Sequence, residues 1–213
     1  MSFEIQDWGL IPYAEAWDLQ KKCLERRITD EVPDQLIFCQ HPPVITLGRG
    51  SIREPDNIAA KSKIPIIEVE RGGLATYHGP GQIIAYPIFK LGRKTVEFAQ
   101  GSRNGVHGLI RSLESWVIEF LQEFAIPATR VEGKTGVWIN GERKIASIGI
   151  AARHWVSYHG IAVNLSTGRE VWGELNPCGL GQEVMTDFYL ESGHLLSYSD
   201  ALNKLSLVAS KHF

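Results

Sequence analysis

The sequence has few cysteines, and their spacing fits neither a disulfide framework nor a structural zinc site. It contains only Cys23, Cys39 and Cys178. This is an odd number, and no two of them have the Cys-x-x-Cys spacing of zinc-binding folds. The fold must therefore be held together by its core, and we expect no bound metal.

Long apolar runs and a strong charge of either sign are also missing. No stretch approaches the length needed to cross a bilayer. The N-terminal residues MSFEIQDWG are acidic where a signal peptide has basic and then apolar residues. The net charge of −2 and the pI of about 6.4 disfavour a nucleic-acid binder driven by bulk charge. We expect a cytoplasmic protein that binds neither nucleic acid nor membranes.

A nucleotide-binding glycine loop is absent as well. The pattern Gly-x-x-x-x-Gly-Lys-Ser/Thr does not occur, and Gly48-Arg49-Gly50 is too short to replace it. Repeats, linkers and low-complexity segments are not found either. At 213 residues, with 44% hydrophobic and 22% charged residues, one domain over residues 1–213 with its own core is expected.

The hydrophobic periodicity predicts helices separated by groups of strands. Apolar residues at three- and four-residue spacing predict helices at Tyr13–Ile28, Val106–Phe124 and Ser199–Lys211. Strands are expected at Phe3–Trp8, Gln35–Gln40, Val44–Leu47, Ile64–Val69, Gln82–Phe89, Gly136–Ile139, Lys144–Ala152 and His154–Ser166, with Asn140-Gly141 as a hairpin turn. This order favours an α+β fold in which helices flank a mixed, mostly antiparallel sheet.

The stretch Arg71–Pro87, RGGLATYHGPGQIIAYP, is the most unusual part of the chain. We interpret its first part as a polar, glycine-rich turn between two apolar strands. An ordinary hairpin turn is the simplest explanation. However, Arg71, Thr76, His78 and Gln82 supply more hydrogen-bonding groups than a plain turn requires. Glycines at such a place also let a ligand approach the backbone closely.

Two side chains are candidates for covalent chemistry. Cys178 lies in Asn176-Pro177-Cys178-Gly179, where the rigid path would expose its sulfur, although it could equally be an idle loop cysteine. Lys144 stands at the start of an otherwise apolar strand. It either points to solvent or is desolvated, and a desolvated lysine can act as a base.

Histidines offer alternative bases, and the spacing does not choose among them. His78, His154 and His159 are each candidates for a cysteine–histidine pair. His41, at the end of a predicted strand, is either a functional residue or a surface residue.

Several segments together resemble one enzyme family. They are HPPVITLG (His41 to Gly48), RGGLATYHGPGQIIAYP (Arg71 to Pro87), the run from Gly136 to Ser166, and NPCGL (Asn176 to Leu180). In these segments the chain is similar to the octanoyltransferases, also called lipoate-protein ligase B, of the biotin/lipoate protein ligase superfamily. The segment after the cysteine, GQEVMTDFYL, matches only loosely.

The resemblance implies roles for individual residues. Cys178 matches the nucleophile that forms a thioester with the acyl chain, and Lys144 matches its partner lysine. Backbone N–H groups near Gly179 or in the glycine-rich stretch are candidate oxyanion donors. Three segments match those that line the acyl substrate: Arg71, Gly72, Gly73, Leu74, Ala75, Thr76, Tyr77 and His78; Ser147, Ile148 and Gly149; Gly160, Ile161 and Ala162.

The resemblance also implies the reaction and its partners. An octanoyl or lipoyl group would pass from acyl-carrier protein to a lysine on lipoyl domains of 2-oxoacid dehydrogenases or on the glycine cleavage H protein. The thioester donor is already activated, so neither ATP nor a metal would be needed, and phosphopantetheine arrives with the substrate. The alternatives are an ATP-dependent lipoate or biotin ligase, a thioesterase that uses His78 or His159, and a non-catalytic carrier-protein binding module.

Overall fold

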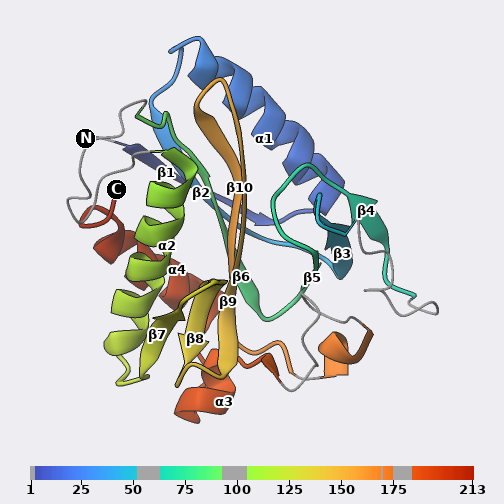
Figure 1. Ribbon diagram of the computed structural model, residues 1–213, viewed down its shortest axis with the longest axis vertical. Coiled ribbons are helices and arrows are strands. Elements are labelled where there is room, and N and C mark those ends of the chain that lie inside the picture. Colours follow the sequence, from blue (N-terminus) through green and yellow to red (C-terminus); the bar gives the residue numbers. More distant parts are fainter. Residues whose placement is uncertain (1–2, 52–62, 93–104, 169, 175–183) are drawn as a thin grey trace.

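The structure is a computed structural model that describes residues 3–51, 63–92, 105–168, 170–174 and 184–213. Two β-sheets and four α-helices make up most of it (Figure 1). The larger, seven-stranded sheet has the order β1-β2-β6-β10-β9-β8-β7, and the smaller, three-stranded sheet has the order β4-β3-β5. The strands are β1 Phe3–Leu10, β2 Asp34–Gln40, β3 Val44–Leu47, β4 Ile66–Glu68, β5 Ala75–His78, β6 Gln82–Ile88, β7 Ala128–Val131, β8 Lys134–Ile139, β9 Arg143–Arg153 and β10 Val156–Asn164.

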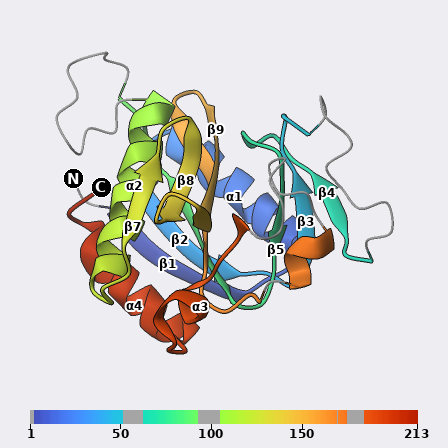
Figure 2. The ribbon, with the colours of Figure 1, turned by 60° about the horizontal axis from the view of Figure 1, so that its bottom comes forward.

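Helices cover both faces of the large sheet. On one face, α1 (Tyr13–Ile28) packs against β6 and β10. On the other face lie α2 (Gly105–Gln122) and α4 (Tyr198–Ala209), while α3 is the short helix Phe188–Ser192. Figure 2 shows the small sheet on the α1 side, away from α2 and α4. This arrangement confirms the predicted α+β fold. Within the large sheet β1 and β2 run parallel, and the other neighbouring strands run antiparallel.

Alternation along the central strands divides the core into two parts. In β2, Leu36 and Phe38 join the cluster under α2 and α4, whereas Ile37 and Cys39 join the cluster under α1. Successive side chains of a strand point to opposite faces. Both faces are covered, so the middle of the strand, from Leu36 to Cys39, is apolar without interruption. In β6 the same alternation turns Ile84 and Tyr86 towards α1.

The glycine-rich stretch Arg71–Pro87 is not the simple turn expected from the sequence. It contains β5, which the sequence analysis missed, and it crosses from the small sheet to the large one. Strand β5 pairs with β3, and β6 pairs with β2 and β10. The predicted strands Ile64–Val69 and Gln82–Phe89 therefore belong to different sheets and do not form a hairpin. At the crossing, Gly81 has φ of +86°, and a Cβ there would lie 2.3 Å from the Ser166 carbonyl oxygen.

Several local predictions are confirmed and others are wrong. The helix Tyr13–Ile28 and the strand Val44–Leu47 have the predicted bounds. Asn140 and Gly141 both have positive φ, as the predicted two-residue hairpin turn requires. The strand expected from His154 begins instead at Val156. His154 and Trp155, with φ of 48° and 62°, form the preceding turn. Strand β7 and helix α3 were not predicted.

Candidate active site

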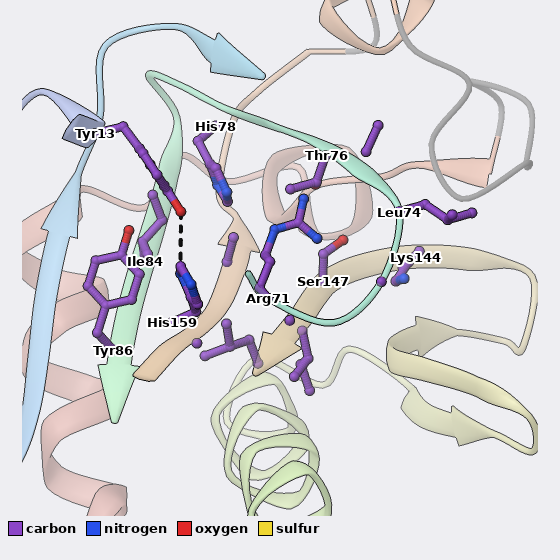
Figure 3. Close-up of a pocket in the computed structure, with 17 residues that line it drawn as sticks. Tyr13, Arg71, Leu74, Thr76, His78, Ile84, Tyr86, Lys144, Ser147 and His159 are labelled. Atoms are coloured by element: carbon purple, nitrogen blue, oxygen red, sulfur yellow. Dashed lines mark hydrogen bonds between the residues drawn. The ribbon is translucent and has the colours of Figure 1, made fainter. Parts of the chain in front are cut away.

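A pocket lies where the small sheet meets the centres of β9 and β10 (Figure 3). Its empty volume, which includes the open mouth, is about 510 Å³. The lining comes from α1, the stretch 71–78, β6, β9 and β10: Tyr13, Arg71, Gly73, Leu74, Ala75, Thr76, His78, Ile84, Tyr86, Lys144, Ser147, Ile148, Gly149, His159, Gly160, Ile161 and Ala162.

Arg71 fixes one wall of this pocket. Its side chain donates from Nη2 to the Thr46 carbonyl oxygen at 2.7 Å and from Nη1 to the Gly72 carbonyl oxygen at 3.0 Å. The Gly72 N–H in turn donates to the Ile150 carbonyl oxygen at 3.1 Å. These bonds join the start of the glycine-rich stretch to β3 and β9. They also place a guanidinium that is only 6% exposed beside the pocket.

Two glycines opposite each other let the backbones approach closely. Gly149 on β9 pairs with Gly160 on β10. A Cβ at Gly149 would lie 2.8 Å from Cδ of Arg71, and a Cβ at Gly160 would lie 1.8 Å from the Ala85 carbonyl oxygen. Neither position can take a larger side chain without movement of its neighbours. The two glycines thus leave room for Arg71 and β6 to pack closely against the hairpin of β9 and β10.

Lys144 lines the pocket and is held by close packing. Its side chain is 7% exposed, and Nζ lies 5.4 Å from the centre of the Trp138 ring. The solvent-pointing alternative is therefore wrong. Gly136 on β8 packs against the side chain, because a Cβ there would lie 2.7 Å from Cε of Lys144. The pairing of β8 with β9 shifts between Val137 and Trp138, next to this contact.

A hydrogen-bonded network connects the strand of Lys144 to the glycine-rich stretch. The Thr186 N–H donates to the Lys144 carbonyl oxygen at 3.0 Å, and the Thr186 carbonyl oxygen accepts from Nδ2 of Asn164 at 2.8 Å. Oδ1 of Asn164 accepts from Nε2 of Gln82 at 3.0 Å. Oε1 of Gln82 lies 3.3 Å from Nδ1 of His78. The network fixes the chain at Thr186, which follows Cys178 by 186 − 178 = 8 residues.

Rings of tyrosine and histidine surround the inner end of the pocket. The Tyr13 hydroxyl lies 3.4 Å from Nδ1 of His159. Behind them, Nδ1–H of His41 donates to the Ile11 carbonyl oxygen at 2.7 Å, and Nε2 accepts from the Tyr86 hydroxyl at 2.6 Å. His41 is fully buried, so the surface interpretation of this residue is wrong.

These histidines are neutral because they are buried. Burial lowers the pKa of His41 to about 4. Burial, with a further contribution from the positive charge of Arg71, lowers the pKa of His159 to about 3. Burial also sets the pKa of His78 well below its ordinary value, and His41 and Arg71 lower it further. The inner end is thus polar but uncharged at neutral pH.

The structure brings together most of the residues predicted to bind substrate. Gly72 and Tyr77 do not line the pocket: Gly72 bonds to β9, and the Tyr77 ring packs against Trp172. His154 is exposed in the β9–β10 turn. Cys178 and Gly179 lie outside the described residues.

The sequence analysis missed three lining residues, Tyr13, Ile84 and Tyr86. The alternation of β6 places Ile84 and Tyr86 on one face, and this signal could have grouped them. Tyr13 carries no such signal, because it reaches the pocket from the first turn of α1.

Within the part of the chain that the structure describes, no helix is long and apolar enough to cross a membrane. The same residues contain no cluster of three or more histidine, cysteine, aspartate or glutamate side chains that could hold a metal ion.

Comparison with known proteins gives consistent matches. Residues 12–201 match the model of the lipoyl protein ligase A/B catalytic domain. An octanoyltransferase of Syntrophobacter fumaroxidans is 42% identical over 183 residues, covering 84% of this chain and 76% of the relative. An octanoyltransferase of Bdellovibrio bacteriovorus is 35% identical over 219 residues, covering 94% of each chain.

Solved structures share the fold at low identity. A lipoate-protein ligase A bound with ATP superposes with a TM-score of 0.71 at 16% identity, covering 100% of this chain and 85% of that chain. A biotin protein ligase from Aquifex aeolicus in complex with biotin and ATP gives 0.54 at 12% identity, covering 98% and 69%. At these identities the likeness concerns the fold alone.

Proposed function

This chain belongs to the lipoyl protein ligase A/B catalytic-domain family, and we propose that it transfers an octanoyl group from acyl-carrier protein to the ε-amine of a lysine on a lipoyl domain. As its relatives' names indicate, it is an acyltransferase. One observation carries the finer proposal: the buried amine of Lys144 lines the same pocket as the apolar side chains of Ile84, Ile148 and Ile161. A reactive group thus borders a space suited to an alkyl chain.

The apolar lining supports an acyl substrate of medium length. Burying a methylene group stabilises a complex by about 0.8 kcal/mol. The six methylenes of an octanoyl chain would therefore contribute roughly 5 kcal/mol. This is enough to favour octanoyl over short acyl chains.

Cys178 is the proposed nucleophile, and it precedes Met185 by 185 − 178 = 7 residues. Met185 forms a parallel bridge with Lys144. A connection of this length spans at most about 25 Å even when fully extended. The anchored end therefore leaves Cys178 within reach of Lys144, as the proposed pairing of the two residues requires.

The first step would load the enzyme. The Cys178 sulfur attacks the thioester carbonyl carbon while Lys144, as the general base, accepts the thiol proton. The bond from that carbon to the phosphopantetheine sulfur then breaks, and the departing thiolate takes the proton back from Lys144. The products are the Cys178 acyl thioester and the free carrier thiol, so no ATP is consumed.

The second step would acylate the acceptor. The lysine ε-amine of the lipoyl domain attacks the Cys178 thioester and gives a proton to Lys144. The bond to the Cys178 sulfur breaks, and this sulfur recovers the proton. Each tetrahedral intermediate carries an oxyanion that backbone N–H groups can stabilise. The Gly72 N–H already donates to Ile150, so Gly73, Leu74 and Gly179 are the proposed sources.

A transfer assay tests this function. Octanoyl-carrier protein and a lipoyl domain are mixed with the protein without ATP, and amide formation on the lipoyl domain is followed by intact mass. We expect transfer by the wild type, and its loss in Cys178→Ser and Lys144→Ala. Release of octanoate without amide would indicate a thioesterase. Transfer only with ATP and free octanoate would indicate a ligase, and carrier binding without turnover would indicate a binding module.

A further inference from the structure

We infer that the ring of Tyr13 sets the length of the acyl chain that this pocket accepts, by closing its inner end. The inference rests on the proposed function, because it assigns the acyl chain to this pocket. It concerns a residue outside the segments whose resemblance to the octanoyltransferases suggested a substrate site.

The two ends of the pocket differ in exposure. Gly73 is exposed, and Leu74 and Ser147 are partly exposed, so the mouth lies beside them. At the other end, Tyr13 is 4% exposed and His159 is 1% exposed. Figure 3 shows Tyr13, Tyr86 and His159 gathered at one end and Leu74 and Lys144 at the other. An acyl chain whose carbonyl lies near Lys144 would point its methyl end towards Tyr13.

The other rings at the inner end are fixed by the sheet and its hydrogen bonds. Tyr86 belongs to β6, and its hydroxyl bonds to buried His41. His159 belongs to β10 and has φ of +57°. Its backbone N–H donates to Oε1 of Gln20 at 3.0 Å. Shortening either side chain would disturb the sheet or its buried partners as well as the pocket.

Tyr13 differs because its ring enters from the first residue of α1, outside the sheet. The ring stacks on His78 with centroids 5.8 Å apart and meets His41 edge-on at 5.1 Å. Its hydroxyl approaches Nδ1 of His159 at 3.4 Å. Removing this ring would open space between fixed neighbours without breaking a strand.

The added space would favour longer chains. Each further buried methylene is worth about 0.8 kcal/mol, which corresponds to roughly a fourfold change in rate or affinity. With two more methylenes, the rate or affinity for a decanoyl chain can therefore rise up to about fifteenfold relative to that for an octanoyl chain. In the wild type the ring would exclude these two carbons.

The test compares chain lengths in three proteins. Wild type, Tyr13→Ala and Tyr13→Phe are each mixed with hexanoyl-, octanoyl-, decanoyl- and dodecanoyl-carrier protein, and the rate of acyl-enzyme formation is measured by intact mass. Wild type should be fastest with octanoyl. In Tyr13→Ala the rate of acyl-enzyme formation with decanoyl-carrier protein, divided by the rate with octanoyl-carrier protein, should rise roughly tenfold. Tyr13→Phe keeps the ring and should retain the wild-type ratio within about twofold.

The outcomes separate this inference from the proposed function. An unchanged ratio in a folded, acylated Tyr13→Ala protein overturns the inference and leaves the function standing. An equal shift in Tyr13→Phe also overturns it, because the hydroxyl contact and not the ring would then set the length. If no chain length acylates the wild type, the proposed function fails and the inference fails with it. Should Tyr13→Ala not fold, Tyr13→Leu must show a shift in the same direction.

Discussion

The Thr186 N–H donates a hydrogen bond to the Lys144 carbonyl oxygen at 3.0 Å, and this bond ties the chain after the Cys178 segment to the strand of Lys144. Asn164 supports the same point from β10, through Nδ2 to the Thr186 carbonyl oxygen. The backbone positions of Lys144 and Thr186 are thus fixed by one set of bonds. The proposed pairing of Cys178 with Lys144 depends on this anchor.

Asn164→Asp should weaken the anchor. The substitution replaces the amide donor with an oxygen that faces the Thr186 carbonyl oxygen in a buried site. A lost buried hydrogen bond costs about 1–3 kcal/mol. We expect Cys178 acylation to slow by roughly tenfold or more. Rapid-quench mass spectrometry measures this rate.

Gln40→Glu is the matched control for that variant. The Gln40 amide also donates to a backbone carbonyl, that of Gln82 at 3.1 Å, but it does not contact Thr186. Its acylation rate should stay near the wild-type value. Equal slowing in both variants would remove the special role of the Thr186 anchor.

Gly136→Ala should displace the Lys144 side chain. The new methyl group would lie 2.7 Å from Cε of Lys144 and 2.5 Å from the Ala146 carbonyl oxygen. Gly133→Ala, in the preceding β7–β8 turn, also has positive φ but meets nothing within 4 Å. Both variants share a backbone cost of about 1 kcal/mol. Only Gly136→Ala should abolish acylation in the mass assay, and matching activities in the two variants would contradict the proposed role of Lys144.

Gly149→Ala should damage the pocket wall. Its methyl group would lie 2.8 Å from Cδ of Arg71 and 3.0 Å from the Gly72 carbonyl oxygen, whereas a methyl group at Gly72 finds its nearest neighbour at 3.4 Å. Overpacking of this kind costs about 1–3 kcal/mol. The midpoint temperature of thermal unfolding should fall and the KM for octanoyl transfer should rise in Gly149→Ala. Both quantities should change little in Gly72→Ala. A tolerated Gly149→Ala would show that the wall is not tightly packed.

His159 should make the protein sensitive to acid. Its folded-state pKa of about 3 lies below the ordinary value of 6.5, so the unfolded chain binds the proton first. The stability that this histidine contributes is complete above pH 6.5 and is lost as the pH falls from 6.5 towards 3. Between pH 7 and pH 5 the loss is about 2 kcal/mol for this group.

His159→Asn removes this titration and keeps a residue that tolerates the left-handed φ of +57°. Urea unfolding at pH 7 and pH 5 should show an acid-induced loss about 2 kcal/mol smaller than in the wild type. His154→Asn, also at positive φ but exposed, should keep the wild-type pH dependence. The same pH dependence in all three proteins would show that His159 is not the source of the acid-induced loss of stability.

The sequence predicted the elements whose pattern is local. The apolar stripe of Tyr13–Ile28 and the Asn140-Gly141 turn needed no information from elsewhere in the chain. Strand β5 was missed because its four residues, Ala75–His78, sit among glycines and pair with β3 some thirty positions upstream. A short polar strand gains its stability from its partner, so its own residues do not reveal it.

The site residues that lie in recognisable motifs were predicted from the sequence. Those that reach the pocket only through the tertiary fold were missed. The segments around Arg71, Ser147 and Gly160 were grouped by family resemblance, and the structure places them around one pocket. Tyr13 was assigned only to a helix, because nothing near it in the sequence indicates which sheet face α1 will cover. The burial of Lys144 likewise follows from the packing of β8 and could not be read from β9 alone.

The most direct test of acyl transfer through Cys178 is the intact mass of the protein after mixing with octanoyl-carrier protein, without ATP, beside a Cys178→Ser control. We expect one octanoyl adduct on the wild type, labile to hydroxylamine and mapped to Cys178, and none on the control. An unmodified wild type that transfers octanoate only when ATP is supplied would overturn the proposed thioester mechanism and make Cys178 a bystander.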